Sequence, residues 1–235
     1  IKPRLEVTIE SERHLSLKQY GFRKKMSTYN NLTLLQLEIM NAKAQGHTSL
    51  VTFLDISGAY NSVNINTLVS QLMHRGVDPF YVAWIQNFFG NKSYSDGINT
   101  LHGSQGLDQG SVLSPMLFNL YIAHVHETGQ DSDVTISSYA DDIRILSHAK
   151  DFSNNIKKME QHLQTLLTSL YNLNLSVNFE KTKAVSFFDS LPTHERASAA
   201  IQIGGQPEIK ISESHKYLGV HLDMKLNGIR HKLCH

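Results

Sequence analysis

Two adjacent acids between short apolar runs restrict the fold of this chain more than any other feature. They are Asp141 and Asp142, in the stretch SSYADDIRIL at residues 137–146. The Tyr, Ile and Leu residues on either side suit a pleated, half-buried strand, whereas Asp is depleted in strands. We therefore expect a pair of strands at about 135–147 with the two carboxylates at their connecting turn.

Strand-like and helix-like segments alternate along the 235 residues. Apolar residues recur at helical spacing or in long buried runs in five segments, which predicts helices at 32–46, 64–75, 79–89, 111–126 and 156–170. Short apolar and β-branched runs predict strands at 49–57, 200–205, 208–212 and 215–223, a pair of strands at 135–147 and a strand–turn–strand at 175–188. Residues 90–111 and 189–200 are expected to be loops. Because tight turns join several neighbouring strands, the pattern favours an α+β fold with antiparallel pairs over a doubly wound parallel sheet.

Composition excludes some classes of protein. The net charge is only +1, so any nucleic-acid site must come from local clusters of basic residues. The single cysteine, Cys234, excludes an internal disulfide framework and fits a reducing compartment. No apolar run approaches the roughly 20 residues of a membrane span, so no membrane partner is expected. The chain opens on Ile1 and closes on RHKLCH, and we expect it to be a fragment of a longer protein.

A third acid, Asp55, ends the strand predicted at 49–57. If that strand neighbours the 135–147 pair, three carboxylates meet and raise each other's pKa unless a cation lies between them. Mg²⁺ prefers such oxygen ligands, and two ions roughly 4 Å apart can drive phosphoryl transfer. The alternative is that each Asp is a solvated turn or a strand-end cap. The residues alone support a hypothesis of metal-assisted phosphoryl transfer.

Several stretches resemble the successive palm motifs of reverse transcriptases in order and approximate spacing. They are FLDISGAYNSV, GLDQGSVLSPMLFNLYI, SYADDIRIL, LSVNFEKTKAVSF and HKYLGVHLD, preceded by QYGFRKKMST. Their amino-acid sequences are most similar to those of non-LTR (LINE-type, jockey-like) retrotransposon enzymes, over about residues 4–225. The resemblance implies a polymerase palm, an antiparallel sheet with packed helices, plus part of the fingers and no thumb. Its implied divisions are partial fingers (1–48), palm with finger-connecting segments (49–212), and primer-grip hairpin with a truncated start of the thumb (213–235).

The resemblance also implies a catalytic set. Asp55 and Asp141 would ligate two Mg²⁺ ions, for which Mn²⁺ is a possible substitute, and Asp142 would support the metal site less directly. The backbone carbonyl of Ile56 is a possible further ligand. Lys181 would act as the general acid that protonates leaving pyrophosphate, although a solvated lysine in a turn is an equally simple interpretation. We also expect Asn178 to fix that turn.

Nucleotide contacts follow from the same motifs. Tyr60 matches the position that excludes a 2′-OH and so selects dNTPs. Gln109 and Gly110 would contact the incoming nucleotide. Arg23, with Lys24 and Lys25, would suit phosphates.

Other residues by resemblance face the primer and template, and two positions depart from the family. Ser111, a candidate N-cap, and Pro115 would begin a helix beneath the template strand. Tyr217, Leu218 and Gly219 would lie near the primer terminus. Asp108 stands where the family usually has Pro, and its negative charge should weaken nucleotide binding. Asn61 stands where the family usually has Asp, at a position that we expect to be structural. The histidines, including HVH at 124–126, lack zinc-like spacing, and we expect no role for them.

The expected function is therefore an RNA-directed DNA polymerase fragment that uses an RNA template, a DNA primer and dNTPs inside the cell, at a nuclear site of reverse transcription. The alternative is a catalytically inactive retrotransposon remnant that still binds nucleic acid. An RNA-dependent RNA polymerase shares the acids, but Tyr60 argues against it. A group II intron or retron enzyme would share the chemistry.

Overall fold

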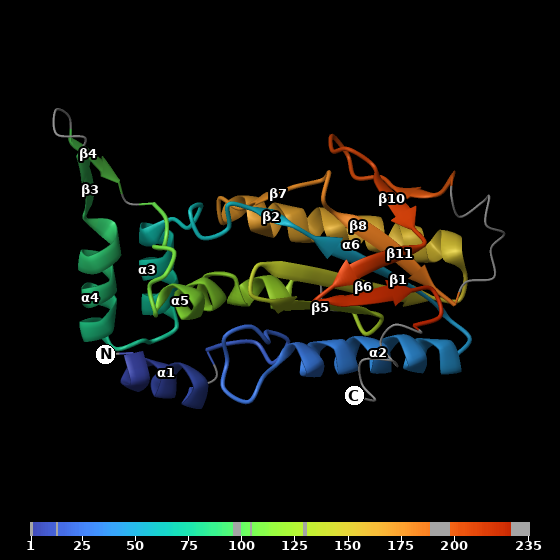
Figure 1. Cartoon of the computed structure of the whole chain (residues 1–235), viewed down its shortest axis with the longest axis horizontal. Helices are drawn as coiled ribbons and strands as arrows, with labels where there is room; N and C mark the ends of the chain where they lie inside the picture. The colour runs from blue at the N-terminus through green and yellow to red at the C-terminus, as the bar shows by residue number, and fades with distance from the viewer. Residues whose placement is uncertain are drawn as a thin grey trace.

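A mixed six-stranded sheet forms the centre of the molecule (Figure 1). The computed structural model describes residues 2–12, 14–95, 100–103, 105–128, 131–188 and 198–226. In spatial order the strands are β5 (Val134–Tyr139), β6 (Asp142–Ala149), β1 (Thr48–Leu54), β8 (Lys183–Phe187), β10 (Ile209–Ser212) and β9 (Ala200–Ile201). Neighbours pair antiparallel except β8 and β10, which pair parallel. The α+β fold expected from the sequence is confirmed.

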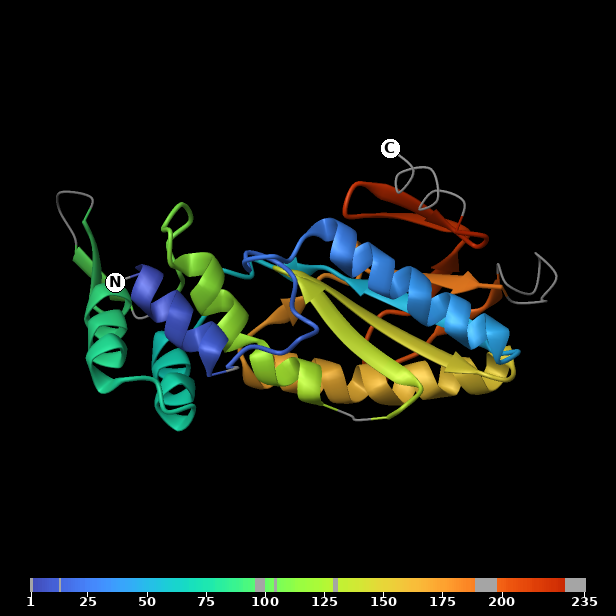
Figure 2. The ribbon, with the colours of Figure 1, turned by 90° about the horizontal axis from the view of Figure 1, so that it is seen from below.

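Each face of the sheet is covered by different elements (Figures 1 and 2). These are α6 (Phe152–Asn172) on one face, and α2 (Thr28–Ala44) with the hairpin of β11 (Ser214–Tyr217) and β12 (Val220–Asp223) on the other. Side chains alternate along a strand, so Ile143 and Ile145 of β6 join the α6 core while Leu146 joins the α2 core. The two faces therefore have separate hydrophobic cores.

The remaining helices gather at one end of the molecule (Figure 1). They are α1 (Lys2–Ser11), α3 (Ile65–His74), α4 (Pro79–Gly90) and α5 (Ser114–Tyr121). Helices α3 and α4 lie close to the predicted ranges, and local capping sets their starts: Asn64 caps α3 by accepting from the N–H of Thr67, and Asp78 caps α4 just before Pro79. In the part of the chain that the structure describes, no helix combines the length and apolarity needed to cross a bilayer.

Some expected elements have different bounds. The strand predicted at 49–57 is interrupted at Asp55, and its last two residues, β2 (Ile56–Ser57), pair with β7 (Ser176–Val177) outside the central sheet. The helix predicted at 111–126 divides into α5 and a 3₁₀ helix at Ala123–Glu127. Helix α1 had not been predicted.

Two predictions were wrong. The expected loop at 90–111 contains a hairpin of β3 (Lys92–Ser95) and β4 (Thr100–Gly103). The sequence between these strands includes an Asp–Gly pair, a hairpin signal that the sequence-based prediction overlooked. Ser111 is not an N-cap, because α5 begins three residues later with Leu113 at the cap. Residues 189–197 of the other expected loop, and 227–235 of the expected thumb segment, lie outside the described residues.

Candidate active site

The register of two central strands brings acids from distant parts of the chain together. Leu54 at the end of β1 pairs with Ile143 near the start of β6. Asp55 follows Leu54 and Asp142 precedes Ile143, so these two acids face each other across the antiparallel pair. Asp141 lies next to them in the turn between β5 and β6. The strands are thus neighbours, as the carboxylate hypothesis required.

These acids interact electrostatically. Burial, with the nearby charges of Asp141 and Asp55, raises the pKa of Asp142 to about 6. Burial, with the charge of Asp141, raises the pKa of Tyr60 to about 12. A partial counter-charge comes from Lys181, whose Nζ lies 3.7 Å from Asp55 Oδ2. The site therefore holds an excess of negative charge that a bound cation would reduce.

The carboxylates fit the ligand chemistry of a divalent ion without forming a complete protein cage. Among the described residues, no three His, Cys, Asp or Glu side chains form a group that could hold a metal ion. Magnesium sites that act on phosphates typically need only one or two carboxylates, because water and substrate phosphates complete the shell. Asp55 and Asp141, with Asp142 beside them, meet that smaller requirement.

A turn after β7 holds Lys181 at the site. The N–H of Asn178 donates to the backbone oxygen of Asp55 at 2.8 Å. The side-chain oxygen of Asn178 accepts from the N–H groups of Glu180 at 3.1 Å and Lys181 at 3.3 Å. Asn178 therefore fixes this turn, as predicted, and ties it directly to Asp55.

A cavity of about 280 Å³ borders the carboxylates. Asp55, Asp142 and Lys181 line it together with His215, Tyr217 and Leu218 from the β11–β12 hairpin. Leu218 and Gly219 both have positive φ, 47° and 78°, as required by the tight turn between the two strands. Tyr217 and Leu218, predicted to face the primer terminus, thus line the same cavity as Asp55 and Asp142, which are predicted to face metal.

The predicted nucleotide loop is attached to the segment that carries Tyr60. The N–H of Leu107 donates to the Tyr60 backbone oxygen and that of Gly106 to the Val63 oxygen, both at 2.8 Å. The Tyr60 ring stacks on Phe118 of α5, with ring centroids 5.0 Å apart. Gln109, Gly110, Ser111 and Pro115 form the rest of the loop and the first turn of α5. Gln109 and Gly110 are exposed.

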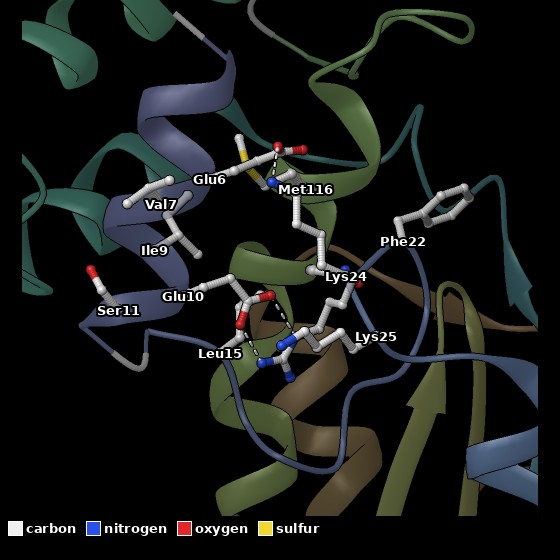
Figure 3. A pocket seen from close by; sticks show the side chains of 12 residues that line it. Glu6, Val7, Ile9, Glu10, Ser11, Leu15, Phe22, Lys24, Lys25 and Met116 are labelled. Carbon is white, nitrogen blue, oxygen red and sulfur yellow. Dashed lines mark hydrogen bonds and ion pairs between the residues drawn. The ribbon is translucent and has the colours of Figure 1, made fainter.

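Arg23 does not line the cavity beside the carboxylates. Its Nε and Nη2 donate to the carboxylate of Glu10 at 2.9 and 2.6 Å, and its Nη1 donates to the backbone oxygens of Ser16 and Gln19. Lys24 and Lys25 are exposed beside a second cavity, of about 450 Å³, between α1 and the start of α5 (Figure 3). A phosphate contact by Arg23 remains a prediction, and it would require this internal set of bonds to rearrange.

Sequence reasoning missed two buried polar side chains near the acids. Arg144, two residues after Asp142, is fully buried; an arginine inside an apolar strand was the available signal. His126, for which we expected no role, is buried with its Nε2 2.9 Å from Ser138 Oγ on β5.

Comparison with known proteins agrees with the motifs. The model of the family described as reverse transcriptase (RNA-dependent DNA polymerase) matches residues 1–222. The RNA-directed DNA polymerase from mobile element jockey of Drosophila melanogaster is 26% identical over 91% of this chain and 24% of its own length. The probable RNA-directed DNA polymerase from transposon BS of the same species is 25% identical over 96% of this chain and 26% of its own length. The chain thus spans about a quarter of these relatives.

Solved structures share the fold. Telomerase from Candida tropicalis in complex with a TWJ fragment of telomeric RNA aligns with a TM-score of 0.62 and 12% identity, over 97% of this chain and 36% of that chain. Apo telomerase from the same species, truncated from its C-terminal domain, aligns with a TM-score of 0.56 and 12% identity, over 96% of this chain and 43% of that chain. The resemblance to non-LTR retrotransposon enzymes is confirmed, and the chain belongs to the reverse transcriptase family.

Proposed function

We propose that this chain forms the palm and part of the fingers of an RNA-directed DNA polymerase. Residues 1–48 would belong to the fingers, 49–212 to the palm with its finger-connecting segments, and 213–235 to the primer-grip hairpin and the start of a thumb. The observation that carries the proposal is the β1–β6 register, which sets Asp55 opposite Asp142 beside Asp141. The names of the transposon relatives and the RNA-bound telomerase support an RNA template.

The proposed reaction joins the primer 3′-oxygen to the α-phosphorus of a dNTP and breaks the bond to pyrophosphate. Asp55 and Asp141 would hold two Mg²⁺ ions, or Mn²⁺ in their place, with the Ile56 carbonyl as a further ligand and Asp142 in support. Such ions activate the attacking hydroxyl and stabilise charge on the leaving phosphates. Lys181 would donate a proton to the departing pyrophosphate.

Substrates would be arranged by the surrounding loops. The Tyr60 ring, supported by Phe118, would exclude the 2′-OH of an rNTP. Gln109 and Gly110 would contact the dNTP, and the turn at 217–219 would contact the DNA primer.

Incorporation of dTTP on a poly(rA) template with an oligo(dT) primer tests the proposal. We expect activity with Mg²⁺ or Mn²⁺ that falls by at least about a hundredfold in Asp141→Asn. Asp133→Asn is the matched control, because Asp133 lies at the opposite end of the same hairpin, where it bonds Lys158 at 2.6 Å. Equal incorporation by folded wild type and Asp141→Asn would contradict the proposal.

A catalytically inactive remnant is the second candidate. Two observations favour it: the acid Asp108 in the nucleotide loop, and the engagement of Arg23 by Glu10. Tight RNA binding without incorporation, in this chain and in one extended at both ends, would support the remnant and exclude the polymerase.

A further inference from the structure

A charged side chain is buried on β6, the strand that begins at Asp142. Arg144 on β6 is the largest fully buried side chain in the described part of the molecule. Its Nη1 donates to Glu38 Oε2 at 3.0 Å, and its Nε donates to Asn31 Oδ1 at 3.4 Å. Both partners lie on α2, so this helix neutralises the charge and contributes to its hydrogen bonding.

Asn31 connects three strands through one buried amide. Besides Arg144 of β6, its Oδ1 accepts from the hydroxyl of Tyr217 on β11 at 3.2 Å. Its Nδ2 donates to the backbone oxygen of Ser138 on β5 at 3.4 Å. The Asn31 side chain is therefore bonded both to the hairpin that carries Asp141 and Asp142 and to the hairpin that carries the 217–219 turn.

These bonds lie on the face of the sheet that carries the candidate site. Asp142 and Arg144 are two residues apart on β6, so their side chains leave the sheet on the same side. Tyr217 lines the cavity next to Asp142, and its hydroxyl bonds Asn31. We propose that Asn31 is a positioning residue that fixes the primer-grip hairpin relative to the catalytic carboxylates.

The hairpin needs such a connection because it is not part of the central sheet. Among the strands that the structure describes, β11 and β12 pair only with each other, and an isolated two-stranded hairpin is marginally stable in water. Apolar contacts of Tyr217, Val220 and Leu222 hold it against α2 and the sheet, but apolar packing is non-directional. The Asn31 hydrogen bonds are directional and can fix the orientation of the hairpin. Removing the amide leaves a buried hydroxyl and a buried guanidinium N–H without this acceptor, which is costly.

Asn155 offers a matched control on the opposite face of the same sheet. It is also a fully buried asparagine on a helix. It accepts from Ser147 Oγ at 2.6 Å and donates to the Thr48 backbone oxygen at 3.0 Å. Asn31→Leu and Asn155→Leu therefore remove similar numbers of buried hydrogen bonds from the same sheet, but only the first removes bonds to Tyr217 and Ser138.

Hydrogen exchange of the full chain tests the positioning role without any need for activity. In Asn31→Leu we expect amides of residues 214–223 to exchange about tenfold faster, as loss of a buried hydrogen bond predicts. Tyr217→Phe should accelerate the same amides, and the double variant should exchange no faster than Asn31→Leu, because Asn31→Leu already removes the Tyr217–Asn31 bond. Asn155→Leu should leave residues 214–223 unchanged. Unchanged exchange there in Asn31→Leu, or acceleration equal to that in Asn155→Leu, would overturn the proposal.

Steady-state incorporation tests the consequence for catalysis, which rests on the proposed polymerase function. Asn31→Leu should raise the KM for primer–template about tenfold and leave the KM for dTTP within about twofold, because the defect lies on the primer side. Asn155→Leu should change neither. Failure of wild-type incorporation would reject the polymerase but leave the exchange result intact. Faster exchange with an unchanged primer–template KM would reject the positioning role.

Discussion

Lys181 Nζ lies 3.7 Å from Asp55 Oδ2, so the proposed general acid is paired with a proposed metal ligand. Both side chains are substantially exposed, 68% and 38%, and exposed ion pairs contribute only about 0.2–1 kcal/mol. Lys181 should therefore compete only weakly with a cation for Asp55.

Replacing Lys181 should distinguish its role as a general acid from its role as a charge that competes with the cation. Lys181→Met removes the competing charge, and we expect Mn²⁺ to bind about two- to fivefold more tightly in the absence of nucleotide, measured by electron paramagnetic resonance. The same variant should lose about a hundredfold in incorporation rate, because the general acid is gone. Lys183→Met is the control, since Lys183 Nζ bonds the Glu180 backbone oxygen, and it should change neither quantity. Unaltered Mn²⁺ affinity in Lys181→Met would argue against the competition.

Tyr60 should determine the choice between dNTPs and rNTPs. Its ring lies on Phe118, which leaves little freedom to move aside. Tyr60→Ala should reduce the preference for dTTP over UTP at least about tenfold, because exclusion by shape is lost. Tyr60→Phe keeps the ring and should keep the preference, measured as the ratio of kcat/KM values. An unchanged ratio in a folded Tyr60→Ala variant would show that the gate lies elsewhere.

Gly21 should tolerate no side chain, because it packs against the turn that carries the acids. A Cβ there would lie 2.3 Å from the Ala140 backbone nitrogen, and neither backbone can move without disturbing the Tyr20–Ser138 bond. Gly21→Ala should lower the free energy of unfolding by about 1–3 kcal/mol or more. Gly204→Ala, where a Cβ meets nothing within 4 Å, is the control. Urea unfolding of the two variants checks this, and equal midpoints would contradict the contact.

Local sequence patterns predicted most of the elements and the core of the site. Asp55 at a strand end and Asp141 at a hairpin turn are visible because strands and turns depend on residues within a few positions. The Tyr217–Asn31 bond spans 186 residues and has no local signal. Arg23 was predicted as a phosphate contact from the basic cluster that it forms with Lys24 and Lys25, and this stays a prediction. Its bonds to Glu10 were not foreseen, because Glu10 lies on α1, a helix whose β-branched residues Val7, Thr8 and Ile9 weaken the helical pattern.

His126 should make the chain sensitive to mild acid. Burial lowers its pKa to about 4, although backbone oxygens of Ala123 and Ile122 oppose that shift. The neutral ring suits its contacts: Nδ1 lies 3.3 Å from the Ala123 oxygen and so donates, which leaves Nε2 to accept from the Ser138 hydroxyl. A histidine in the unfolded chain has a pKa of about 6.5, so between about pH 4 and 6.5 this residue binds more protons in the unfolded chain than in the folded chain. Stability from this residue is therefore complete above that range and is lost as the pH falls through it.

A glutamine at position 126 offers a donor and an acceptor but does not titrate. We expect the melting temperature of His126→Gln to fall less than that of wild type between pH 7 and pH 4, measured by circular dichroism without metal. His221→Gln, at an exposed position on β12, controls for removal of one histidine and should follow the wild-type curve. Carboxylates that titrate in the same range act equally on all three proteins, so the difference between curves reports His126 alone. Parallel curves for His126→Gln and wild type would show that this histidine accepts its proton without opening the packing behind the β5–β6 hairpin.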